Sequence, residues 1–413
     1  MQGLAIQIFF YDHTGDRKWS TSGNWAGGNK PYSNFNNAVD NFAYGDQYMD
    51  IGNDNLNLDH IQFRTYQNLI LATSDLTLKR VVVSNSGNPN IALNGRKFTL
   101  YMTLYDGYQV FPFSVSGTGT FLIREDNANP GIRTLRLTSG AFRNGPTVQL
   151  QHTDLTLGNA GQGNYIVTGS TINIPGGSVT ANAKISASVI NLTGGDFFHL
   201  DSGSITSSTI DMTGGVLRNR ASMNNTTVNV TGGEFTSTAS MEKCDTHMSG
   251  SSVFKLDTYN SVISEYSGGT ITLSETSKLY NKYNIANAGI TVNSGTNAYS
   301  LGDISNTTIT INGGTFQSNG KMKGVSANVT NGTMNIGYVA LAGSTRVNES
   351  DVYTGGTINQ SGGEIFNIRS MEGSTINITG GKYYHGRGKN ANGTFFRSAG
   401  ELMCPQNMYQ LAC

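Results

Sequence analysis

Acidic side chains recur directly after paired glycines, and they are the residues of this chain best suited to acid–base chemistry. Asp196 and Glu234 each follow a Gly-Gly pair, and His199 comes three residues after Asp196. Two carboxylates acting as acid and base, or as acid and nucleophile, are the usual machinery of glycan cleavage. In stacked turns, Asp196 and Glu234 would lie about 10 Å apart, which is wide for a retaining pair. We therefore expect solvated corners and no catalytic residue; a catalytic group of Asp196, Glu234 and His199 is the alternative.

A second group combines aromatic and basic side chains near the C-terminal end of the sequence. Tyr383, Tyr384, His385 and Arg387 lie within five residues of one another. The pattern indicates first a plain surface loop; an exposed patch that contacts a sugar or a partner chain is the alternative, and it makes these four residues a possible interface. The aromatic pair Phe395 and Phe396 follows, and we count it with the same interface.

Two segments contain metal-ligand types. Cys244 and His247 are three residues apart, but a metal site needs more ligands than this segment supplies. The run from Asp50 to Asp59 is rich in carboxylate and amide oxygens, which Ca²⁺ prefers, yet it lacks the glycine and terminal glutamate of a helix-loop-helix calcium loop. We expect no cofactor, with Ca²⁺ at this run as the alternative.

These residues must be positioned by a repeat, because one short pattern returns along the second half of the chain. It reads apolar, polar, apolar, then a fourth residue and Gly-Gly, and its clearest copies begin at Ile172, Ile190, Ile210, Val228 and Ile376. Successive copies, including weaker ones, are mostly 18 to 20 residues apart, and two longer steps indicate inserted loops of about 6 and 12 residues. A unit of this length suits one turn of a β-solenoid.

Within each unit, the alternation predicts a strand with one buried face, and the glycine pair predicts a corner where positive φ is accepted. The polar position of successive units holds an amide or hydroxyl, as in Asn173, Asn191 and Asn377. Stacked amides can bond to one another along such a column. We therefore predict an all-β, right-handed parallel β-helix with 18 to 20 residues per turn, capped ends and an outward asparagine ladder.

Composition agrees with an ordered β protein. Charged residues are only 13% of the chain, glycines number 52, and formal net charge is +0. Neither a nucleic acid nor an anionic membrane is favoured as a partner. No apolar run is long enough for a membrane span, and no secretion signal is recognisable at the N-terminal end. Of the three cysteines, only Cys404 and Cys413 lie close enough in sequence to close a local disulfide loop.

The N-terminal third carries a resemblance to a known group. The segment from Trp19 to Trp25 reads W-x-x-x-x-N-W, and Gly-rich turns with alternating leucines follow to about residue 165. This resembles the opening of autotransporter-passenger-like and related bacterial surface β-helix proteins, a solenoid also used in phage fibres. The resemblance implies a right-handed parallel β-helix displayed at a surface, and we count Trp19 and Trp25 as interface residues.

The sequence therefore divides into four expected parts. Residues 1–60 form an N-terminal cap with the tryptophan motif, 61–165 the irregular first turns, 166–381 the regular repeats, and 382–413 a C-terminal cap or assembly segment. We expect a non-enzymatic structural or adhesive protein of a cell surface, extracellular filament or virion. Its expected partners are copies of itself, other surface or virion subunits, and glycans. A polysaccharide-degrading β-helix enzyme, such as a phage depolymerase, lyase or glycosidase, is the alternative.

Overall fold

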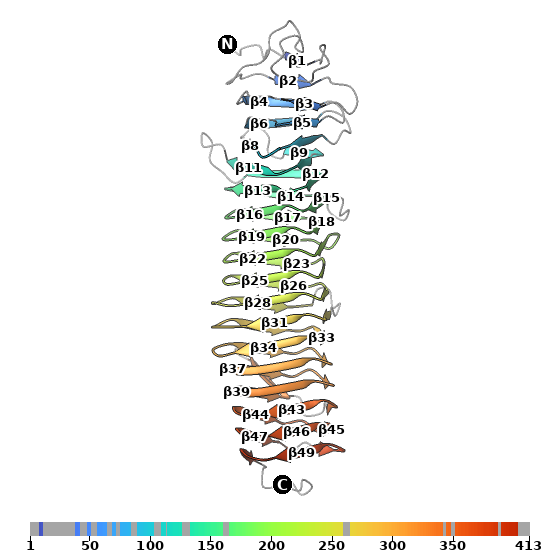
Figure 1. Cartoon of the computed structure of the whole chain (residues 1–413), viewed down its shortest axis with the longest axis vertical. Coiled ribbons are helices and arrows are strands. Elements are labelled where there is room, and N and C mark those ends of the chain that lie inside the picture. The colour runs from blue at the N-terminus through green and yellow to red at the C-terminus, as the bar shows by residue number, and fades with distance from the viewer. Residues whose placement is uncertain are drawn as a thin grey trace. The chain divides into compact units, whose positions relative to one another are not determined.

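The computed structural model describes most of the chain as strands. The described residues are 8–10, 38–41, 48–50, 56–63, 68–71, 75–83, 89–102, 109–112, 114–125, 133–159, 165–258, 265–341, 344–347, 352–386 and 390–403, and they contain no helix. The chain divides into two compact units, Met1–Ile210 and Asp211–Cys413. In each unit, parallel strands of successive turns stack on one another, so the predicted parallel β-solenoid is confirmed (Figure 1).

Three columns of strands make up the first unit, because each regular turn contributes one strand to each column. The first column contains β1 (Ile8–Phe10), β2 (Ala38–Asn41), β4 (Leu56–Phe63), β6 (Leu76–Val83), β8 (Lys97–Met102), β11 (Gly119–Glu125), β13 (Pro146–Gln151), β16 (Thr171–Ile174), β19 (Val189–Leu192) and β22 (Thr209–Met212), in which the division between units falls. The second column contains β9 (Gln109–Pro112), the first part of β12 (Arg133–Arg143), β14 (Thr153–Leu157), β17 (Ser178–Ala181) and β20 (Asp196–His199). The third column contains β3 (Tyr48–Asp50), β5 (Asn68–Ile70), β7 (Asn90–Ala92), β10 (Ser114–Ser116), the end of β12, β15 (Tyr165–Thr168), β18 (Ala183–Ser186) and β21 (Ser204–Thr206).

The second unit has the same three columns. The first contains β25 (Thr227–Val230), β28 (Asp245–Met248), β31 (Thr270–Leu273), β34 (Gly289–Asn293), the starts of β37 (Thr308–Ser318) and β39 (Ser326–Ile336), β43 (Thr357–Gln360), β46 (Thr375–Ile378) and β49 (Thr394–Arg397). The second contains β23 (Val216–Asn219), β26 (Glu234–Ser237), β29 (Val253–Leu256), β32 (Lys278–Asn281), β35 (Asn297–Ser300), the ends of β37 and β39, β44 (Glu364–Asn367), β47 (Lys382–His385) and β50 (Glu401–Met403). The third contains β24 (Ser222–Asn224), β27 (Met241–Glu242), β30 (Glu265–Ser267), β33 (Asn284–Ala286), β36 (Ile304–Ser305), β38 (Met322–Lys323), β42 (Tyr353–Thr354), β45 (Met371–Glu372) and β48 (Asn390–Ala391). An antiparallel hairpin of β40 (Tyr338–Leu341) and β41 (Ser344–Val347) interrupts this order.

The core of each unit is built by the alternation that the sequence predicts. On β16, Ile172 and Ile174 are 0% exposed, whereas Asn173 between them faces outward. Equivalent rings stack from turn to turn, as Phe235 and Phe254 do with centroids 4.6 Å apart. Each such side chain stabilises the fold by about 1.5–3 kcal/mol through burial, which a single turn could not provide alone.

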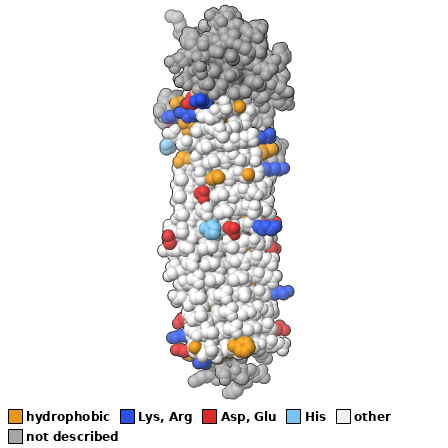
Figure 2. Space-filling view, in the orientation of Figure 1, with side chains coloured by type: hydrophobic (Ala, Val, Ile, Leu, Met, Phe, Trp, Pro, Cys, Tyr) orange, Lys and Arg blue, Asp and Glu red, His pale blue; other side chains and the backbone are white. Residues whose placement is uncertain are grey.

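The outward asparagine ladder is confirmed. The side-chain amide of Asn191 donates to Asn173 Oδ1 at 2.8 Å, and that of Asn377 donates to Asn359 Oδ1 at 2.8 Å. Each pair is 18 residues apart. On the face drawn in Figure 2, charged side chains are sparse and uncharged polar surface predominates.

A second polar ladder lies inside the corner that follows the third column. In the first unit, the backbone N–H of Ser170 donates to Ser188 Oγ at 3.2 Å, and the Ser188 N–H donates to Ser208 Oγ at 3.3 Å. Each hydroxyl donates to the carbonyl two residues before its own position. The residue before each serine has positive φ, including Ala187 at 47° and Ser207 at 48°. The hydroxyl ladder therefore stabilises a corner that costs backbone strain.

The Gly-Gly corner is tight for a steric reason. Gly233 has φ of 88°, and a Cβ there would come within 2.4 Å of the Gly215 carbonyl oxygen. Stacked corners thus approach too closely for a side chain, as the repeated glycines predict. The hand of the coil, the capped ends and the four-part division stay predictions.

Candidate functional site

The three residues of the catalytic alternative, Asp196, Glu234 and His199, do not converge. Asp196 and His199 are three residues apart on β20, so they point to opposite sides of the strand. Asp196 is half-buried on the outer face, where its register neighbour is Ser178. His199 is 0% exposed, and its Nε2 lies 2.9 Å from the carbonyl oxygen of Ala183. The imidazole therefore belongs to the interior packing and is shielded from an external substrate.

Glu234 is engaged by a neighbouring lysine. Its Oε2 lies 2.6 Å from Lys255 Nζ, and Thr236 donates to its Oε1 at 3.1 Å. In the ladder, Glu234 lies between Val216 and Val253. This carboxylate therefore contributes to an ion pair on the outer face of β26.

The expectation of an exposed patch is wrong for Tyr383 and His385. Both lie on the inner face of β47, where they are 0% and 4% exposed, because the alternation of the strand continues past the Gly-Gly pair. Only Tyr384 between them faces outward, and its ring stacks on Phe366 with centroids 4.4 Å apart and planes 3° apart. This stacking covers one face of each ring.

The remaining predicted residues have mixed outcomes. Phe395 is half-buried and contacts Tyr383 edge-on, with centroids 6.0 Å apart, whereas Phe396 is 59% exposed on β49. Trp19, Trp25, Arg387, Cys404 and Cys413 lie outside the described residues, as do residues 51–55 of the run from Asp50 to Asp59. Their predicted roles stay predictions.

Cys244 occupies a place in the corner ladder that serine or threonine holds in other turns. It is 0% exposed, and its Sγ lies 3.4 Å from the Glu242 carbonyl oxygen. Burial raises the pKa of this thiol to about 11. Asp245 and His247 are exposed on β28. Among the described residues, no group of three or more His, Cys, Asp or Glu side chains is placed to hold a metal ion.

A groove of about 570 Å³ lies on the outer face of the third column in the second unit, and we call it the third-column groove. Its strands are β30, β33, β36, β38 and β42. The two longer steps of the repeat correspond to inserted residues at 258–264 and 337–352. These insertions directly precede β30 and β42 in the chain. Both insertions thus occur between a strand of the second column and the following strand of the third.

Two rows of side chains line the groove from turn to turn. The first row contains Glu265, Asn284, Asp303, Lys321 and Val352, and the second contains Ala286, Ser305, Lys323 and Thr354. Neighbours along a row are about 4.8 Å apart, the spacing of adjacent strands. Ile304 and Met322 lie beneath the rows and are buried. The side chains that line the groove are therefore mainly polar and charged, and the apolar side chains of these strands belong to the core.

Asp303 and Lys321 are linked through the backbone. The N–H of Lys321 donates to Asp303 Oδ1 at 2.8 Å, and this bond holds the carboxylate against the next turn. Glu265, Asp303, Lys321 and Lys323 are all exposed. Among the described residues, none of these four side chains forms an ion pair. The groove therefore presents charges that the described part of the protein leaves available to a ligand.

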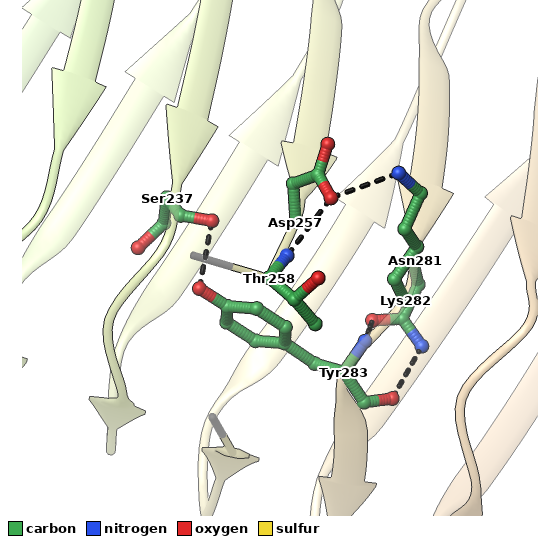
Figure 3. A network of polar contacts seen from close by, with 6 residues as sticks. All are labelled: Ser237, Asp257, Thr258, Asn281, Lys282 and Tyr283. Atoms are coloured by element: carbon green, nitrogen blue, oxygen red, sulfur yellow. Dashed lines mark hydrogen bonds and ion pairs between the residues drawn. The ribbon is translucent and has the colours of Figure 1, made fainter. Parts of the chain in front are cut away.

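A polar network holds the corner beside the first insertion (Figure 3). Asp257 Oδ1 accepts hydrogen bonds from Lys282 Nζ at 2.9 Å and from the Thr258 N–H at 2.8 Å. Asn281 bonds both the N–H and the carbonyl oxygen of Tyr283, at 2.9 and 3.0 Å. Tyr283 is thereby turned inward, and the next residue, Asn284, faces the groove.

Arg369 has the equivalent task beside the second insertion. It is 0% exposed, and its guanidinium donates to the backbone carbonyl oxygens of Asn319 and Gly320. Gly320 immediately precedes Lys321, so the arginine fixes the turn that delivers this lysine to the groove. Burying a guanidinium is costly unless its N–H groups are hydrogen-bonded, and here backbone carbonyl oxygens accept from it.

The sequence analysis missed the groove, although a spacing signal exists. Glu265, Asn284, Asp303, Lys321 and Val352 each lie six residues before the first apolar residue of a repeat copy. These positions lie in or directly before strands of two or three residues, which are too short to show a repeated alternation. Counting six residues back from the start of each repeat copy would have placed these five residues at one equivalent position of the turn.

Chemically, the groove can bind hydroxyl-bearing or charged ligands. Carboxylates at Glu265 and Asp303 accept hydrogen bonds, the Asn284 amide both donates and accepts, and the lysines supply positive charge. The volume is within the range of ligand pockets. Fold and groove together define a parallel β-solenoid with a polar groove on one outer face.

Comparison with protein-family models, curated proteins and solved structures finds no match for the chain. The described residues also contain no helix that is long and apolar enough to cross a membrane.

Proposed function

We propose that the protein is a non-enzymatic attachment protein, displayed on a cell surface, an extracellular filament or a virion, that binds its target through the third-column groove. The observation that carries the proposal is the set of exposed charges in this groove, at Glu265, Asp303, Lys321 and Lys323. On the outer face of the first column, by contrast, Asn377 bonds to Asn359 of the neighbouring turn. Convergent polar and charged side chains in a groove are typical of a ligand site.

The placement of the groove supports the same role. Loops inserted into a solenoid commonly gather on its binding face. Here the inserted residues 258–264 and 337–352 immediately precede β30 and β42, two strands that line the groove. The resemblance of the Trp19 to Trp25 segment to bacterial surface β-helix proteins supports display outside the cytoplasm.

Self-association is a second part of the proposal, because the last described turn carries exposed apolar side chains. Phe396 on β49 is 59% exposed and Met403 on β50 is 48% exposed. Apolar side chains beside a sheet edge favour contact with another chain. We propose that this end joins a second copy or another subunit.

The test is a binding screen of the full-length chain against a glycan array, run together with a reducing-sugar assay on every glycan that binds. Binding without sugar release, weakened by a variant with Glu265→Gln and Asn284→Ala, is the expected result. Binding that this variant leaves unchanged would place the attachment surface elsewhere. Light scattering of Phe396→Ser beside the parent chain tests the association.

One observation favours glycan cleavage as a second candidate. Glu265 and Asp303 lie two turns apart on the same row of the groove, so their backbones are about 10 Å apart, near the upper end of the carboxylate separation in inverting glycosidases. If this candidate holds, the screen will detect sugar release, and both Glu265→Gln and Asp303→Asn will abolish it while binding persists.

A further inference from the structure

We propose that Lys321 and Lys323 form an anion subsite of the third-column groove, and that the ligand of the groove is an acidic glycan. This inference rests on the proposed attachment function and specifies the chemistry of its target. The two lysines lie on either side of buried Met322, so both project from the outer face. Alternate residues of a strand are about 6.6 Å apart, which lets both ammonium groups reach one carboxylate or sulfate.

Hydroxyl groups surround the second lysine. In the register of the third column, Lys323 pairs with Ser305 on one side and with Thr354 on the other. The row therefore reads hydroxyl, ammonium, hydroxyl at steps of about 4.8 Å. Such a set can neutralise an anion and also donate hydrogen bonds to its remaining oxygens.

The rest of the groove selects against a ligand that is anionic throughout. Glu265 and Asp303 place negative charge in the first row, within two turns of one another. A nucleic acid or a polyglutamate chain would bring like charge against both carboxylates. A glycan with spaced acidic groups can place one anion at the lysines and donate sugar hydroxyls to the carboxylates.

A peptide strand is also a poor occupant. The groove lies on the face of the third column, where the backbone groups of each strand already pair with the turns above and below. Peptides recognised as strands bind to free sheet edges. Recognition here must therefore use side chains, which suits a polyhydroxylated ligand.

The experiment compares an oligouronide with the same oligosaccharide after its carboxyl groups have been reduced to alcohols, using calorimetric titration of the full chain. The double variant Lys321→Gln and Lys323→Gln should bind the oligouronide at least about tenfold more weakly, as expected for the loss of charge-assisted contacts. The reduced oligosaccharide should bind parent and double variant equally and weakly. Lys278→Gln, an exposed lysine on the second column, is the matched control and should leave binding unchanged.

Each contrary outcome has a distinct meaning. Equal affinity of parent and double variant for the oligouronide overturns the anion subsite but leaves attachment intact. Equally tight binding of single-stranded DNA, polyglutamate or inorganic sulfate overturns the glycan assignment, because the lysines would then bind any anion. Failure of every glycan to bind the parent chain overturns the attachment function itself, and the subsite with it.

Discussion

The hydroxyl group of Tyr283 donates a 2.8 Å hydrogen bond to the main-chain carbonyl of Ser237, which lies 46 residues earlier. The bond therefore joins the turns on either side of the one in which the first insertion begins. In turns without an insertion, the same corner position holds a small residue, such as Ala221, Ala239 or Gly302. A Cβ at Gly302 would come within 1.7 Å of the Tyr283 carbonyl oxygen, so the ordinary corner has no room for more.

Arg369 repeats this relationship at the second insertion. In both cases, the turn that follows an inserted loop places a long side chain at the corner, and that side chain bonds to carbonyls of the turn before the loop. The long side chain thus supplies the donor that an ordinary stacked corner would have supplied.

Replacing Tyr283 by phenylalanine should lower the free energy of unfolding by about 1 kcal/mol, because it removes one buried hydrogen bond without changing the packing volume. Chemical denaturation of parent and variant measures the difference. Tyr280→Phe is the matched control, since Tyr280 is half-exposed on the outer face and stacks on Tyr299. Equal losses in both variants would contradict the special role of the inner hydroxyl.

Arg369→Leu should destabilise the second unit by about 2–4 kcal/mol, since it leaves the carbonyl oxygens of Asn319 and Gly320 without this donor. Hydrogen exchange should rise first around residues 319–323, and ligand binding at Lys321 should weaken with it. The exposed Arg397→Leu on β49 serves as control. An unchanged exchange rate in the 319–323 turn would show that Arg369 does not hold it.

Asn359 is the middle member of an outward ladder, because it donates to Asn328 at 2.9 Å and accepts from Asn377 at 2.8 Å. Asn359→Ala removes both bonds and should cost about 1 kcal/mol in an exposed setting. Asn359→Asp keeps the acceptor and loses only the donor, so it should cost less, as Asp211 already accepts from Asn229 in this way. Denaturation midpoints in the reverse order would refute the ladder.

Cys244 should be inert toward thiol reagents in the folded protein and reactive after unfolding, since it is buried and its pKa is raised to about 11. The raised pKa stabilises the fold fully below the usual thiol pKa of 9.0, and this contribution is lost as pH rises through about 11. Denaturation between pH 8 and 11 should therefore show falling stability.

Cys244→Ser is the variant that tests this assignment. Serine should be tolerated there, because Ser188 and Ser208 hold the equivalent corner of other turns and donate the same bond. The alkaline loss of stability should be smaller in Cys244→Ser than in the parent chain. An equal slope in both proteins would assign the effect to other groups, including buried Tyr266 and Tyr353, whose pKa values burial also raises.

The sequence was informative where a strand has a full alternating pattern. The apolar, polar, apolar order of Ile172, Asn173 and Ile174 correctly predicts which of them are buried. A four-residue strand of the first column is long enough to show this alternation. The same rule, extended one strand further, would have placed Tyr383 and His385 inside. Their aromatic and basic character suggested a surface, but stacked turns leave interior space that large polar side chains fill.

The groove could not be recognised from local pattern. Lys323 belongs to a strand of two residues, Lys321 directly precedes that strand, and Glu265 belongs to a strand of three. Their common face is set by pairing between turns, which only the repeat register reveals. Likewise, nothing in the local sequence of Arg369 indicates that its partners are about 50 residues away.

The corner between the second and third columns has a consequence for how this chain can change. An added loop at that corner leaves the ladder register after it intact, as the paired strands β38 and β42 on either side of the hairpin show. One long side chain in the following turn, Tyr283 or Arg369, then bonds to the carbonyl oxygens of the turn before the loop. New surface can therefore be acquired or exchanged at this position turn by turn, while the stacked scaffold that carries it is inherited unaltered.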